Sequence, residues 1–260
     1  MRIVVLIKEV PDPNVEASEL SVAESGVDLI IPTGVPSVIN GYDANAVEAA
    51  LQLRERFGGT VSAISLGRSS AQSVLREALA MGVDDVHLLE DARPDAVYDP
   101  VHTATTLADA ITAGGAVDIV VCGRQSSDRD GGQVPAMIAG LLDCALVSPV
   151  TFVEDDGDQV VVRRPLRDGY QRVALTGPAV LAVSSETNEP RFPKMMASAK
   201  ARKAFIAGEP VGADVASPRV ELRRLRIPET AGHAEMVGGA NGAAAGSELA
   251  DRLHEMGLIR

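Results

Sequence analysis

Short apolar runs alternate with helix-length segments through the first two thirds of this 260-residue chain. Five runs have the length and composition of buried strands, at residues 3–7, 61–66, 86–89, 117–122 and 179–183. Strands that are separated by helices are joined by crossover connections, which keep the strands parallel. The pattern therefore predicts an α/β fold built on an open, mostly parallel, Rossmann-like sheet.

Four helices are predicted between these strands, over residues 43–57, 70–81, 99–113 and 133–142. The second is the clearest, because its apolar residues follow i, i+3, i+4 spacing and Gly82 is a natural C-terminal stop. Asp43 is the expected N-cap of the first helix. Residues 150–176 change to short alternating runs that the DDGD and RDG turn signals separate. This change predicts antiparallel hairpin strands added to the parallel sheet.

The chain after residue 206 is rich in Gly, Pro and Ala and poor in large apolar side chains, so it cannot form a core of its own. We expect residues 238–247 to be a flexible connector and residues 247–256 to be a short helix. Leu249, Leu253 and Met256 would share one face of that helix. The expected parts are an α/β domain over 1–187, a basic segment over 188–206 and a C-terminal arm over 207–260.

The net charge of −12 disfavours binding to nucleic acid, whose phosphates require a positive surface. Residues 191–205 are the exception, with five basic side chains and no acidic one. Nothing approaches the roughly 18 consecutive apolar residues of a membrane span, so no membrane insertion is expected. Cys122 and Cys144 do not suggest a disulfide framework, and the expected location is the reducing cytoplasm. The four histidines are scattered without metal-ligand spacing, so no metal site is predicted.

Polar loops follow the predicted strands, at residues 8–13, 65–70 and 123–133, and a further one at 40–43 precedes the first helix. Ligands bind at the carboxyl ends of the strands in open α/β sheets. The 123–133 loop is glycine-rich and opens a helix, whose unpaired N–H groups favour an anion. Its candidate phosphate cradle is Gly131, Gly132, Gln133 and Val134, with Arg124 or Arg129 adding charge. An ordinary solvent loop is the alternative, because neither a GxGxxG nor a Walker pattern is present.

No catalytic constellation is predicted. Ser126, Ser127 and Asp128 have no histidine that the sequence places nearby, and they are interpreted as turn and capping residues. Met195 and Met196 lie in basic, Pro-rich surroundings, which favours an exposed and adaptable contact surface. The alternative is that both methionines pack against the sheet of this chain.

Five blocks resemble, in order and spacing, the electron transfer flavoprotein β subunit: VVLIKEVPD, SVINGYDANAVEAALQLRE, VLREALAMGVD, CGRQSSDRDGGQVPAMIAGLLD and NEPRFPKMMASAKARKA. The resemblance runs from residue 1 to about 206 and returns at 228–232 and in the terminal helix. It implies an adenine-nucleotide-binding fold and an α-subunit partner, with FAD at the junction of the two subunits. Electrons would pass from flavin-dependent dehydrogenases toward a quinone oxidoreductase. A slot in the β subunit would hold AMP, or a second FAD as in electron-bifurcating members.

The resemblance also implies functional residues. The partner-recognition loop falls on residues 188–203, with Met195 as its apolar anchor, and the C-terminal arm would contact the α subunit. Gly41, Pro135 and Met195 stand where the family usually has proline, glycine and leucine. The basic residues expected to bind partners are Arg191, Lys200, Arg202 and Lys203. The nucleotide slot would be lined by Leu6, Ile7, Lys8, Asn40, Gly41, Tyr42, Asp43, Ser65, Leu66, Gly67, Cys122, Gly123, Arg124, Gln125, Asp128, Asp130, Gly131, Gly132, Gln133 and Val134.

Two other classes of protein share this topology. One is a stress-type protein that binds ATP or AMP as a homodimer, although the helix-opening glycine run is short for a triphosphate. The other is a hydrolase or ligase of the same fold superfamily, for which candidate nucleophiles and metal ligands are lacking in the sequence.

Overall fold

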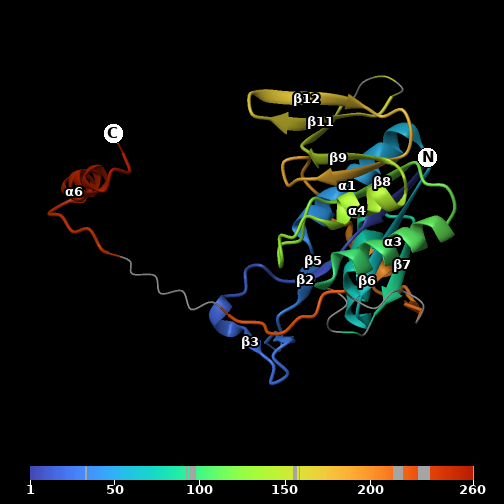
Figure 1. Ribbon diagram of the computed structural model, residues 1–260, viewed down its shortest axis with the longest axis horizontal. Coiled ribbons are helices and arrows are strands. Elements are labelled where there is room, and N and C mark those ends of the chain that lie inside the picture. The colour runs from blue at the N-terminus through green and yellow to red at the C-terminus, as the bar shows by residue number, and fades with distance from the viewer. Residues whose placement is uncertain are drawn as a thin grey trace. The chain divides into compact units, whose positions relative to one another are not determined.

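The computed structural model describes residues 1–32, 34–91, 93, 98–154, 157, 159–212, 219–227 and 235–259. Its centre is a parallel sheet made of β1 (Arg2–Leu6), β6 (Thr60–Gly67), β7 (Asp85–Glu90), β8 (Ile119–Gly123), β9 (Ala145–Val150), β13 (Ala179–Val183) and β14 (Gly208–Pro210). These seven strands lie in the order β14-β7-β6-β1-β8-β13-β9 (Figure 1). Each pairing in the sheet is parallel, which confirms the predicted α/β class.

Helices cover both faces of this sheet. Helices α1 (Gly41–Phe57) and α2 (Gln72–Met81) pack on one face, and α3 (Pro100–Ala113) and α4 (Val134–Leu141) pack on the other. Because side chains alternate along a strand, Ile3 and Val5 of β1 join the α1/α2 cluster while Val4 and Leu6 join the α3/α4 cluster. Burial on both faces explains why the strands appear in the sequence as continuous apolar runs.

The four predicted helices are all present, but the start of α1 differs from the prediction. Its N-cap is Asn40, and Asp43 lies inside the first turn. The carboxylate of Asp43 is buried and accepts hydrogen bonds from the backbone N–H groups of Lys8, just after β1, and of Gly123 in β8, so it does not cap the helix. The predicted stop of α2 is confirmed, because Gly82 follows the helix with a φ of 120°.

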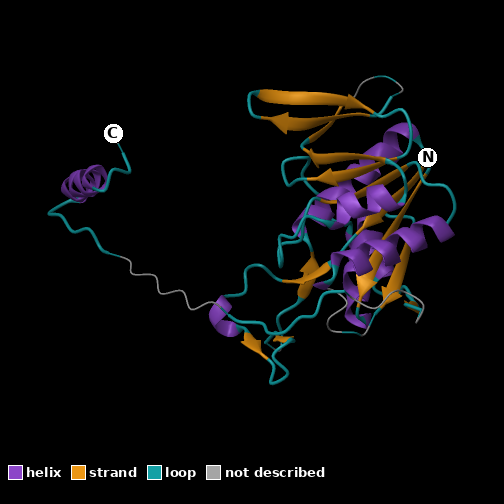
Figure 2. Cartoon of the chain, viewed as in Figure 1, coloured by secondary structure: helices purple, strands orange, loops and turns teal. Residues whose placement is uncertain are grey.

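Antiparallel strands form where the hairpin was predicted: β10 (Phe152–Glu154), β11 (Val161–Leu166) and β12 (Gly169–Ala174). They make a three-stranded sheet of their own and do not extend the parallel one (Figure 2). The sequence analysis did not predict β9, which occupies the edge of the parallel sheet that such strands would need. The separate sheet instead packs on the α1/α2 core through Val162, which is fully buried.

The segment between β1 and α1 contains two further antiparallel pairs that the sequence analysis did not predict. Strands β2 (Glu9–Pro11) and β5 (Ser37–Ile39) pair with Val10 opposite Val38, and β3 (Ser21–Val22) pairs with β4 (Leu29–Ile30). The 3-10 helix η1 (Ala17–Glu19) also lies in this segment, while the 3-10 helix η2 (Ser69–Ala71) precedes α2 and helix α5 (Met195–Ala201) follows β13.

The chain divides into compact units at residues 1–226 and 227–260. In the first unit, β14 adds to the sheet at β7, the N–H of Arg219 donates to Asp99, and the N–H of Leu225 donates to the carbonyl of Gly26 at 2.7 Å. The resembling residues 228–232 lie outside the described part. No helix of the described residues is both long and apolar enough to cross a membrane.

The second unit contains helix α6 (Gly242–Glu255), which is longer than predicted. It begins inside the stretch that we expected to be a flexible connector, so that prediction is wrong for residues 242–247. The side chain of Asn241 caps the helix by accepting a hydrogen bond from the N–H of Ala244 at 2.9 Å, and the alanines that follow favour helix. No described residue of α6 is buried, and Leu249 and Met256 are exposed.

Candidate functional site

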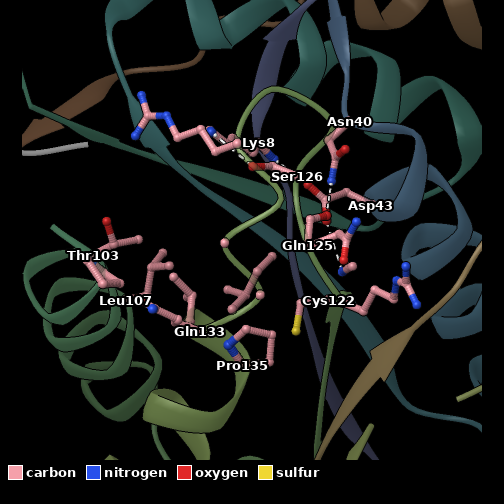
Figure 3. A pocket seen from close by; sticks show the side chains of 18 of the residues that line it. Lys8, Asn40, Asp43, Thr103, Leu107, Cys122, Gln125, Ser126, Gln133 and Pro135 are labelled. Carbon is pink, nitrogen blue, oxygen red and sulfur yellow. Dashed lines mark hydrogen bonds between the residues drawn. The ribbon is translucent and has the colours of Figure 1, made fainter. Parts of the chain in front are cut away.

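A cavity of about 340 Å³ lies at the carboxyl ends of β1, β6 and β8. Leu6, Leu66 and Cys122 line it from these strands, and all three belong to the sheet face that α3 and α4 cover. Figure 3 shows Thr103 and Leu107 on one wall of the cavity, with Asn40 and Asp43 across from them. The cavity therefore lies where parallel α/β sheets bind ligands.

Most residues predicted for the nucleotide slot line this cavity together. The exceptions are of two kinds: Gly41 and Tyr42 line a smaller hollow of about 240 Å³, and Ser65, Gly67, Asp128 and Asp130 line neither. Ser65 is fully buried at a position of β6 that faces α1 and α2. The predicted residues that line the cavity are Leu6, Ile7, Lys8, Asn40, Asp43, Leu66, Cys122, Gly123, Arg124, Gln125, Gly131, Gly132, Gln133 and Val134.

The sequence prediction missed one wall of the cavity. Tyr98, Pro100, Thr103 and Leu107 belong to α3 and the residues just before it. Ser126 and Pro135 also line the cavity, as does Arg129, which the sequence had suggested as an added charge. The apolar spacing of residues 99–113 showed that this segment is a helix that faces the sheet. It did not show that the first turns of this helix border the cavity.

Asn40 fixes the loop that follows β8. Its side-chain Nδ2 donates to the carbonyl of Gln125 at 2.9 Å, and its Oδ1 accepts from the N–H of Ser127 at 3.0 Å. Asn40 is only 1% exposed, so these bonds form away from water, where an unpaired amide would be unfavourable. The loop that borders the cavity is thus held in place by the residue that begins α1.

Lys8 and Asp128 form an ion pair at the edge of the cavity. The Lys8 ammonium donates to both carboxylate oxygens of Asp128, at 2.6 and 2.7 Å, and to Ser126 Oγ at 3.3 Å. Burial lowers the pKa of Lys8, and Asp128 counteracts this by favouring the charged form. Asp128 does not line the cavity itself. It affects the site by pairing with Lys8 and by holding the loop after β8 next to it.

The wall before α4 presents unpaired backbone donors. Within the described residues, the N–H groups of Gly131, Gly132 and Gln133 donate to no other group, and all three residues line the cavity. Gly132 has a φ of 61°, in the left-handed region that favours glycine. Arg124 adds a guanidinium whose Nε is buried without a partner. Unpaired N–H groups at the start of a helix, with a cation beside them, form a site for an anion.

Residues 188–206 carry a conspicuously exposed set of large apolar side chains. Met195 and Met196 are 89% and 86% exposed, and Phe192 and Phe205 are each 92% exposed. The alternative that both methionines pack against the sheet of this chain is therefore wrong. The basic side chains of Lys200, Arg202 and Lys203 are exposed, whereas Arg191 is partly buried.

Comparison with known proteins identifies the family. Residues 27–209 match the protein-family model described as "Electron transfer flavoprotein domain". The chain is 44% identical over 195 residues to the electron transfer flavoprotein subunit beta of Thermoanaerobacterium thermosaccharolyticum, covering 75% of this chain and 72% of that protein. The chain belongs to the electron transfer flavoprotein family, as a β subunit.

Two further relatives extend this comparison. The caffeyl-CoA reductase-Etf complex subunit CarD of Acetobacterium woodii is 38% identical over 193 residues, which cover 74% of this chain and 71% of CarD. Protein FixA of Azorhizobium caulinodans is 37% identical over 213 residues, which cover 79% of this chain and 74% of FixA. The role of this electron transfer flavoprotein β subunit is that of an electron carrier subunit.

Proposed function

We propose that this β subunit binds the adenylate group of a nucleotide in the cavity at β1, β6 and β8, and that it works only with an α subunit. The observation that carries the proposal is the wall of unpaired N–H groups at Gly131, Gly132 and Gln133, in a cavity that Arg124 also lines. A phosphate would accept hydrogen bonds from this wall and gain from the positive end of α4. These donors offer hydrogen atoms and no acceptor, so they suit an anionic group such as phosphate.

The remaining walls suit a base and a ribose. Leu6, Leu107 and Val134 supply apolar surface, while Asn40 and Gln125 supply amides at the opposite side. A volume of about 340 Å³ is at the small end of ligand pockets. It favours AMP, or the AMP half of a second FAD whose flavin lies outside the cavity.

The redox group is an FAD shared with the α subunit, and it supplies the electron transfer when it is bound at the subunit junction. This chain's own residues bind and orient nucleotides and perform no bond-making chemistry. The proposed electron donors are flavin-dependent dehydrogenases, and the acceptor is a quinone oxidoreductase. The name of CarD, a subunit of a caffeyl-CoA reductase-Etf complex, supports a redox-enzyme partner for this chain. Two free cysteines fit a reducing compartment such as the cytoplasm.

Residues 188–203 are the proposed docking segment for dehydrogenases, with Met195 as its anchor. A cluster of exposed apolar side chains among basic residues is typical of an interaction surface on an acidic protein. Lys200, Arg202 and Lys203 would steer acidic partners toward it. Residues 227–260, which include α6, are proposed to contact the α subunit.

Mass spectrometry of the bound nucleotides tests the cavity assignment. The chain would be expressed with and without its α subunit, denatured, and the released nucleotides identified and counted. We expect one adenylate per β subunit in either preparation, as AMP or as FAD, and a further FAD only when the α subunit is present. If neither preparation releases an adenine nucleotide, the proposal is contradicted.

A further inference from the structure

The docking segment is fastened at both of its ends. On the N-terminal side, the hydroxyl of Thr187 donates to the carbonyl of Val150 in β9 at 2.6 Å. On the C-terminal side, Ala201 and Ile206 are buried, and the carbonyl of Ala204 accepts a hydrogen bond from Arg76 Nε of α2 at 3.3 Å. The apolar side chains between these points are nevertheless exposed. These apolar side chains are therefore exposed although the segment that carries them is attached to the rest of the domain at both ends.

Helix α1 holds the first residues of this segment through two sets of hydrogen bonds. The first is reciprocal: Asn45 Nδ2 donates to the carbonyl of Asn188 at 2.7 Å, and Asn188 Nδ2 donates to the carbonyl of Asn45 at 3.0 Å. The second is made by the guanidinium of Arg191, which lies between two carboxylates and donates to both; we call this arrangement the fork of Arg191. Its Nε and Nη2 donate to Glu48 at 2.7 and 3.0 Å, and its Nη1 and Nη2 donate to Glu55 at 2.5 and 3.2 Å.

The fork of Arg191 combines charge with a fixed geometry. The side chain of Glu48 is 5% exposed, that of Arg191 is 33% exposed and that of Glu55 is 52% exposed, so the pairing is strongest on the buried side. Only the planar guanidinium can serve two carboxylates with paired hydrogen bonds, because a lysine ammonium is a single point charge. The backbone N–H of Arg191 also donates to Glu48, at 3.2 Å, which fixes the main chain immediately before Phe192.

We propose that Glu48 and Glu55 are positioning residues for docking: through Arg191 they hold the exposed side chains of Phe192, Met195 and Met196 in the arrangement that a partner binds. The inference rests on the proposed docking role of residues 188–203. An interface segment that is ordered in advance loses less conformational entropy on binding. Arg191 was expected to attract partners by its charge, but its two carboxylates largely neutralise it, so its contribution is geometric.

A pair of matched substitutions separates geometry from charge. Arg191→Lys keeps the net charge but removes the fork, whereas Lys200→Gln removes one charge from α5 and leaves the fork intact. Hydrogen exchange would be followed in the full-length chain at the α5 amides of Ser198 and Arg202, which donate within the helix at 2.9 and 3.0 Å. We expect Arg191→Lys to speed exchange there by about tenfold, with exchange in β1 and β8 unchanged, and Lys200→Gln to have no effect.

The same variants would then be assembled with the α subunit and tested in stopped flow against a flavin dehydrogenase that reduces the wild-type protein. We expect Arg191→Lys to raise the dissociation rate of the docked complex by about tenfold and Lys200→Gln to lower only the association rate. Flavin and adenylate content should stay as in the wild type, because neither residue lines the cavity.

The outcomes distinguish this inference from the proposed function. Unchanged exchange in α5 of Arg191→Lys would overturn the positioning role, while the nucleotide assignment would be untouched. Faster exchange with unaltered electron-transfer kinetics would show that the fork orders the segment but does not serve docking, which also overturns the inference. Unchanged exchange and unchanged rates of association and dissociation in Arg191→Lys, which keeps the positive charge, would mean that Arg191 acts by its charge after all.

Discussion

The carboxylate of Asp43 accepts a hydrogen bond of 2.9 Å from the backbone N–H of Gly123. Its second oxygen accepts one of 2.8 Å from the N–H of Lys8. One side chain of α1 thus joins the carboxyl ends of β1 and β8, the two neighbouring strands that border the cavity. Burial of this carboxyl group raises its pKa to about 7, although the hydrogen bonds oppose the rise.

Stability should therefore depend on pH through Asp43. Between about pH 4 and pH 7 the folded protein keeps the proton that the unfolded chain releases, so the contribution of Asp43 to the free energy of unfolding is largest at low pH. It is lost as the pH rises to about 7, with a slope of up to about 1.4 kcal/mol per pH unit. We expect the free energy of unfolding of Asp43→Asn, measured by urea unfolding from pH 4 to 8, to lack this dependence on pH. Asp109→Asn, an exposed control on α3, should retain it, and equal slopes for all three proteins would contradict the prediction.

Gly123 should tolerate no side chain. A Cβ built there would lie 2.5 Å from Asp43 Oδ1 and 2.6 Å from Tyr42 Cβ, so Gly123→Ala must push α1 away from β8. We expect a loss of about 1–3 kcal/mol in stability, a lower Tm and a lower adenylate content. Gly131→Ala is the matched control, because its Cβ would meet nothing within 4 Å and its N–H group remains. A Gly123→Ala variant with wild-type Tm and nucleotide content would refute this account.

The phosphate cradle should depend on the backbone and not on hydroxyl groups. Gly131→Val combined with Gly132→Val places branched side chains at the wall and strains the left-handed backbone at Gly132. The double variant should lose the nucleotide, while Ser126→Ala should keep it. Mass spectrometry of the denatured proteins measures both. An undiminished content of AMP or FAD in the double variant would rule out binding through these N–H groups.

Steering and anchoring should separate at the docking segment. Neutralising Lys200, Arg202 and Lys203 together should slow association with a dehydrogenase and weaken its dependence on salt. Met195→Ala should mainly speed dissociation. The free energy of binding should weaken by roughly 1–3 kcal/mol if the side chain is fully buried in the complex. Because Met195 is 89% exposed in the free chain, its replacement should leave the Tm unchanged. Stopped-flow reduction gives the rates, and a lowered Tm with unaltered kinetics would contradict the anchor role.

Helix α6 should become protected when the α subunit binds. Leu249 on α6 and Met256 just after it are exposed, and apolar side chains of this kind gain by burial against a partner. We expect hydrogen exchange at residues 247–257 to slow in the presence of the α subunit, while exchange in the core strands stays the same. Equal protection of residues 247–257 with and without the α subunit would argue against this contact.

Local patterns in the sequence determined the five inner strands of the parallel sheet and the four helices that cover it. The apolar run predicted as a strand at residues 179–183 coincides with β13. The apolar spacing of residues 70–81, followed by Gly82, predicted the buried face and the end of α2. These features depend on neighbours within one strand or a few helical turns, so a sequence contains them directly. The glycine-rich loop before α4 was recognisable for the same reason, since an unpaired helix start is a local property.

Only the tertiary structure decided which elements meet. The chain's packing brings Thr103 and Leu107 of α3, and Tyr98 just before it, to a cavity at the ends of β1, β6 and β8, which are neighbours in the sheet. Asp43 was read from the sequence as a cap, because its role depends on Lys8 and Gly123, which are distant along the chain. The fork of Arg191 on Glu48 and Glu55 likewise joins residues about 140 positions apart. Side-chain pairing across such separations is set by packing and not by periodicity, and this is why the sequence did not specify it.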